Sequence, residues 1–106
     1  MLNFYEFEQW IVNFYKERGW DQTTRFEKLG FLFEEIGEIA KAVRLYEIKK
    51  DNPNEKQKEE ELIKAEILEE LGDLLANLII FANDFEISLD ELTDQHKLKL
   101  LKRFKN

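Results

Sequence analysis

The sequence predicts an all-α protein with a four-helix bundle-like protomer that assembles into oligomers. Hydrophobic residues make up 43% and charged residues 37% of the chain, a mixture too apolar for disorder. With four Gly and one Pro, the chain is too poor in turn residues for a many-stranded β protein. Its 106 residues suit a single domain spanning residues 1–106, and so short a chain buries limited surface unless partner subunits help.

Residue types that are missing exclude several kinds of site. The absence of Cys excludes a disulfide scaffold, thiolate zinc sites and thiol chemistry, and the single His96 excludes sites that need two imidazoles. Any metal must then be held by carboxylates. A net charge of −7 argues against a nucleic-acid polymer as the main partner. No leader pattern and no apolar run of ~18 residues is present, so we expect a cytoplasmic protein without a membrane partner.

The first two helices are predicted at about residues 3–17 and 25–48, where apolar residues recur every three or four positions. Gly19 suits a C-terminal cap for the first helix, and Thr23 or Thr24 can cap the second. The core stripe expected for the second helix consists of Leu29, Leu32, Phe33, Ile36, Ala40 and Val43.

The third helix is predicted after a loop at residues 49–54, which have the charge, Asn and Pro typical of loops. It should begin between Glu55 and Glu61 and reach residue 83 or 84. From Leu74 to Ala82 this helix is apolar nearly all round, so the stretch should be central or covered by another subunit.

The fourth helix should begin with a capping box at Ser88 and run to about Arg103. Its C-terminal part is locally basic. We interpret that part as a solvated helix face and not as a polyanion site.

Acidic clusters on the second and third helices carry the functional argument. Glu34, Glu35 and Glu38 share their side of the second helix with apolar residues, which a purely solvated face would not usually carry. On the third helix one narrow strip holds Glu66, Glu70, Asp73, Asn77 and Asp84. The residues around this strip are almost all apolar, so part of it must be buried or lie in a cleft. Glu69 points away and is interpreted as structural, and the run at residues 59–61 as a solvated face.

Two acidic strips on neighbouring helices would repel one another. At ~4 Å and an effective dielectric near 20, each like-charge pair costs on the order of 4 kcal/mol, so the carboxylates must take up protons, bind cations or move apart. Oxygen-only ligands favour Mg²⁺, or Mn²⁺, over Zn²⁺. Buried, partly protonated carboxylates are the alternative that the residues alone leave open.

The motifs Glu34-Glu35-x-x-Glu38 and Glu70-x-x-Asp73 resemble those of the MazG-type all-α nucleoside triphosphate pyrophosphohydrolases. The similarity extends over about residues 14–102. It implies an oligomeric helical protein, dimer or tetramer, that hydrolyses a (d)NTP between the α and β phosphates to a monophosphate and pyrophosphate. The 31 residues between Glu38 and Glu70 exceed the spacing in many members. Ala76-Asn77 stands where phosphoribosyl-ATP pyrophosphatases carry Tyr-His, which argues against that substrate.

The resemblance assigns roles residue by residue. Glu35, Glu38, Glu70 and Asp73 match the metal ligands, and Glu34 matches a residue that joins the metal shell or positions the attacking water. Asn77 matches a position that can face substrate. Trp20 resembles an aromatic that stacks on the base, with a core or lid role as the alternative. For Lys28, Lys97 and Arg103 the choice lies between phosphate contact and a surface role, with the surface role favoured, and His96 is interpreted as a bystander.

Two function classes follow. The first is a Mg²⁺-dependent pyrophosphohydrolase that removes noncanonical or surplus nucleotides from the pool. The second is a catalytically inactive helical interaction protein of the same fold, whose acidic strips serve assembly. A ferritin-like di-iron site is excluded because it needs Glu-x-x-His pairs from two helices.

Overall fold

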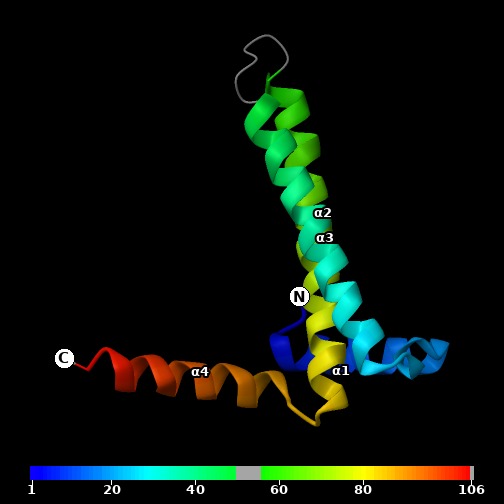
Figure 1. Ribbon diagram of the computed structural model, residues 1–106, viewed down its shortest axis with the longest axis vertical. Coiled ribbons are helices and arrows are strands. Elements are labelled where there is room, and N and C mark those ends of the chain that lie inside the picture. Colours follow the sequence, from blue (N-terminus) through cyan, green and yellow to red (C-terminus); the bar gives the residue numbers. More distant parts are fainter. Residues whose placement is uncertain (50–55, 106) are drawn as a thin grey trace. The chain divides into compact units, whose positions relative to one another are not determined.

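The computed structural model describes residues 1–49 and 56–105, and all its regular elements are helices. Its elements are α1 (Phe4–Arg18), the short 3₁₀ helix η1 (Trp20–Gln22), α2 (Arg25–Lys49), α3 (Lys56–Asp84) and α4 (Leu89–Arg103) (Figure 1). The described residues contain no strand, which confirms the all-α prediction. Residues 50–54 of the predicted loop lie outside the described residues.

The chain forms two compact units. The hairpin unit, Phe26–Asn77, contains nearly all of α2 and most of α3, which run side by side (Figure 1). The terminal unit combines Met1–Arg25 with Leu78–Asn106 and therefore holds α1, η1, the end of α3 and α4.

Local capping chemistry sets the ends of α1 and the start of α4. The Asn3 side chain accepts a hydrogen bond from the Glu6 N–H at 2.8 Å, and the Glu6 carboxylate accepts one from the Asn3 N–H, which completes a capping box. Gly19 ends α1 in the left-handed region, at φ 71°, as predicted. Ser88 caps α4 by accepting from the Glu91 N–H at 3.1 Å.

Two side chains tie segments of the terminal unit together. Glu8, 8% exposed, accepts a buried hydrogen bond at 2.8 Å from the N–H of Leu89, the first residue of α4. Arg25 donates to the Asp84 carbonyl at 2.9 Å and lies over the Phe85 ring, so it satisfies a C-terminal carbonyl of α3. Both contacts join residues far apart in the sequence.

The core confirms one sequence prediction and corrects another. Within the apolar stretch of α3, Ala76, Ile79, Ile80 and Ala82 are buried. On α2, only Leu32 of the predicted core stripe is buried, and Leu29, Phe33, Ile36, Ala40 and Val43 are exposed. The prediction was wrong because α2 carries two apolar faces. The face that holds Glu35 and the buried Ala42 is the one withdrawn from solvent.

Candidate metal centre

Two helices of the hairpin unit supply the acidic side chains of the candidate site. Glu35 lies on α2, three residues after the buried Leu32, and is itself half-buried. Glu70 and Asp73 lie on α3 at i and i+3, a spacing that places both on one face of the helix. Glu70 is half-buried and Asp73 is exposed, so the group extends from the helix interface to solvent.

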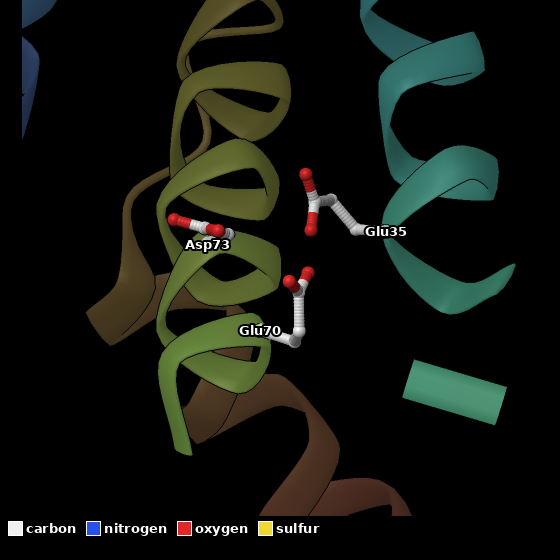
Figure 2. A group of neighbouring side chains, drawn as sticks. All are labelled: Glu35, Glu70 and Asp73. Atoms are coloured by element: carbon white, nitrogen blue, oxygen red, sulfur yellow. The ribbon is translucent and has the colours of Figure 1, made fainter. Parts of the chain in front are cut away.

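The three carboxylates form a compact group. One oxygen from each of Glu35, Glu70 and Asp73 lies within 4.8 Å of the other two (Figure 2). Figure 2 shows Glu35 reaching from α2 toward the Glu70 carboxyl on α3. A side-chain hydrogen bond joins Glu35 to Glu70, while Oε2 of Glu35 is buried and finds no hydrogen-bond donor among the described residues. A buried carboxylate oxygen without a donor is costly, unless another group satisfies it.

The pKa of Glu35, one of the three carboxylates, is clearly shifted. Burial, as the largest cause, together with the hydrogen bond with Glu70 and the negative charges of Asp73, Glu70 and Glu38, raises the pKa of its carboxyl from 4.5 to about 7. Two carboxyl groups joined by a hydrogen bond must share a proton. Near neutral pH the group is therefore poised between holding a proton and holding a cation.

The residues present fit a hard divalent cation. All three ligand groups are carboxylates, the type that Mg²⁺ and Mn²⁺ prefer, and one buried oxygen of Glu35 has no hydrogen-bond partner among the described residues. Glu35, Glu70 and Asp73 would hold the ion. Cation binding would replace the shared proton and remove the repulsion within the group.

The other acids predicted for the site lie around this group. Glu34 and Glu38 are exposed on α2, outside the three-carboxylate group, although the charge of Glu38 acts on Glu35. Asn77 is half-buried on α3, four residues beyond Asp73, and Glu69 is exposed, as expected of a residue that points away. Every member of the three-carboxylate group was predicted from the sequence.

The predicted substrate-binding residues have different environments. Lys28, for which a surface role was favoured, is only 4% exposed, so the surface interpretation is wrong. It is four residues before Leu32, on the withdrawn face of α2 that a single-sequence pattern did not identify. Trp20 and Lys97 belong to the terminal unit and are exposed. The Trp20 ring packs edge-on against Phe14 and Tyr15, with centroid distances of 5.8 and 5.5 Å.

The described residues thus form an all-helical protein whose hairpin unit carries a candidate metal site of three carboxylates. Residues 25–106 match the family model of the MazG nucleotide pyrophosphohydrolase domain, and the chain belongs to that family. The matched region includes all of α2, α3 and α4. This result confirms the resemblance inferred from the two acidic motifs.

A bacterial relative extends the similarity to the N-terminal helix. The uncharacterised protein YvdC of Bacillus subtilis (strain 168) is 43% identical over 99 residues, which cover 93% of each chain. No solved structure matches the chain significantly.

Within residues 1–49 and 56–105, no helix has the length and apolar character needed to cross a membrane.

Proposed function

We propose that this protein is a Mg²⁺-dependent nucleoside triphosphate pyrophosphohydrolase, with Mn²⁺ as an alternative metal. It would hydrolyse a (d)NTP between the α and β phosphates and release the monophosphate and pyrophosphate. In this way it would remove unwanted nucleotides from the cytoplasmic pool. Residues 1–106 would act as one domain. The observation that carries the proposal is the three-carboxylate group with its orphaned Glu35 oxygen. That group lies on the helices that match a pyrophosphohydrolase family.

The chemistry follows from the side chains. Glu35, Glu70 and Asp73 are the proposed metal ligands, and Glu38, which is exposed outside the three-carboxylate group, is proposed as a fourth. A bound divalent cation supplies a more acidic coordinated water and neutralises charge on phosphate oxygens. Glu34 joins the ligands or orients the attacking water. Proposed substrate contacts come from Asn77, Trp20, Lys28 and Lys97.

We also propose that two or four copies assemble, with the exposed stripe of α2 as one interface. Its residues, Phe26, Leu29, Phe33, Ile36, Ala40 and Val43, alternate intervals of three and four, the spacing of a coiled-coil seam. Phe26 is 86%, Phe33 66% and Ile36 52% exposed within one chain. Contiguous apolar surface of this kind marks protein interfaces. Phe33→Glu should reduce the mass measured by light scattering, and an unchanged mass would contradict this interface.

A nucleotide panel tests the activity. The protein is incubated with Mg²⁺ and canonical and modified (d)NTPs, and pyrophosphate release is measured with and without excess chelator. We expect chelator-sensitive release that Glu35→Gln abolishes and Glu69→Gln leaves intact. Glu69 is a matched control because it is adjacent to Glu70 but exposed and outside the group. Folded protein that releases no pyrophosphate from any nucleotide would instead support the inactive interaction protein.

A further inference from the structure

Helix α4 receives little packing from the rest of the terminal unit. Its first residue, Leu89, is buried, and the helix contacts α1, but every residue from Asp90 to Lys105 is exposed. A helix of 15 residues is marginal in water by itself, because helices in proteins gain most of their stability from packing. The exposed part of α4 therefore needs a partner.

One face of α4 is largely apolar and forms a shallow, open groove. Leu92, His96, Leu100 and Phe104 recur every four residues, so they lie along one side of the helix. Together with Lys97 and Leu101 they line a groove of about 690 Å³. The Phe104 side chain is 69% exposed. This stripe is separate from the α2 seam, which lies in the other compact unit.

The charges of α4 are divided between its two ends. All its acids, Asp90, Glu91 and Asp94, lie in the first half, and residues after Asp94 include no acid. The bases of this region are Lys97, Lys99, Lys102, Arg103 and Lys105. An antiparallel copy of the same helix would place acidic half against basic half at both ends, whereas a parallel copy would place like charges together.

We propose that α4 is an interaction surface for α4 of a second copy, paired antiparallel through the Leu92 to Phe104 stripe. The pairing is isologous, and it is self-complementary in apolar surface along the stripe and in charge at its two ends. An anionic membrane is a poorer partner, because the acidic half of α4 and the net charge of −7 would be repelled. This contact is independent of the proposed activity.

Cross-linking tests the pairing directly, because the chain has no Cys and each introduced thiol is unique. Single variants Asp90→Cys, Lys99→Cys and Lys105→Cys are treated with a short bismaleimide. The stripe is centred near residue 98, so Lys99→Cys should link to its own copy. Asp90→Cys and Lys105→Cys should each fail alone and link when mixed, because antiparallel pairing separates identical ends by ~24 Å at 1.5 Å per residue.

Matched apolar variants test the face. In the Lys99→Cys background, Leu100→Glu should lower the linked fraction about tenfold, because it places a charge in the contact. Leu98→Glu, on the opposite side of α4, should leave it unchanged. Glu17→Cys on α1 controls for collisional linking, and circular dichroism checks that each variant is helical.

Several outcomes would overturn the proposal. Self-linking at both ends without mixed linking would mean parallel pairing, and no linking at any position would mean that α4 has another partner. Binding to anionic vesicles in place of linking would assign α4 to a lipid surface. Pyrophosphate release is measured separately, so failure of the pairing and failure of the proposed enzyme activity are distinguishable.

Discussion

Two carboxylates withdrawn from solvent, Glu8 in the terminal unit and Glu35 in the hairpin unit, have opposite surroundings. Glu8 accepts a hydrogen bond at 2.8 Å from the first N–H of α4, where the helix dipole also favours negative charge. Glu35 instead faces the carboxylates of Glu70 and Asp73, and one of its oxygens is buried without a donor among the described residues.

The difference separates a structural carboxylate from a candidate ligand. A carboxylate that accepts a hydrogen bond from a buried backbone N–H helps to hold the fold together. Removing such a side chain should therefore lower the stability of the protein. A side chain held among like charges costs stability unless a proton or cation arrives, so neutralising it should relieve the fold and abolish function. Burial alone does not distinguish the two cases.

The largest expected effect is on activity, from neutralising the hairpin-unit carboxylates. Asp73→Asn or Glu35→Gln should lower pyrophosphate release by more than about 100-fold, beyond the usual loss from residues that only support a metal ligand. Thermal melts in chelator should show stability unchanged or raised, because a repulsive charge is gone. Strong destabilisation of both metal-free variants would mean that these carboxylates are structural pairs.

Sequence reasoning predicted all three members of the carboxylate group because its residues follow helical spacing. Glu70 and Asp73 lie on one face of α3 because they are three residues apart. The residues around them are mostly apolar, so this face is expected to be partly buried or to lie in a cleft. The same reasoning failed for the core face of α2. Phe33 and Leu32 are equally apolar, and periodicity cannot say which face packs within the chain and which is left for another molecule.

The second effect concerns the fold. Glu8→Ala should lower the free energy of unfolding by about 1–3 kcal/mol, because it leaves the buried Leu89 N–H without its acceptor. Chemical denaturation measures the change, and Glu17→Ala, an exposed acid on the same helix, is the control. If folded Glu8→Ala keeps a metal-dependent activity, Glu8 is structural and differs in role from Glu35. If Glu8→Ala is as stable as the parent, the structural role of Glu8 is wrong.

The role of Glu8 could not be predicted from the sequence. Its position, four residues after Phe4 and three before Ile11, places an acid beside an apolar stripe, which is a signal of an unusual environment. The donor, however, is 81 residues away, and no local pattern connects them. Lys28 was missed for the same reason: its burial depends on packing that acts between segments distant in the sequence.

The smallest effect is the pH dependence that Glu35 should give to the stability of the protein. The folded-state pKa of Glu35 is about 7 against 4.5, so between these values the folded protein holds a proton that the unfolded chain has lost. Its contribution to stability is full below pH 4.5, falls as pH rises and is gone above about pH 7. Solvent reaches the group, and screening reduces the size of this effect.

Thermal melts in chelator across this pH range, compared between the parent and Glu35→Gln, isolate the contribution of Glu35. The Gln amide can still donate a hydrogen bond to Glu70 but cannot ionise, so the parent should lose stability relative to the variant as pH rises. Added Mg²⁺ should oppose that loss increasingly toward pH 7, because metal binding displaces the proton. If the stabilities of the two proteins change with pH in parallel, the pKa of Glu35 has its ordinary value. Glu35 would then not be the strained carboxyl that distinguishes the hairpin unit from Glu8.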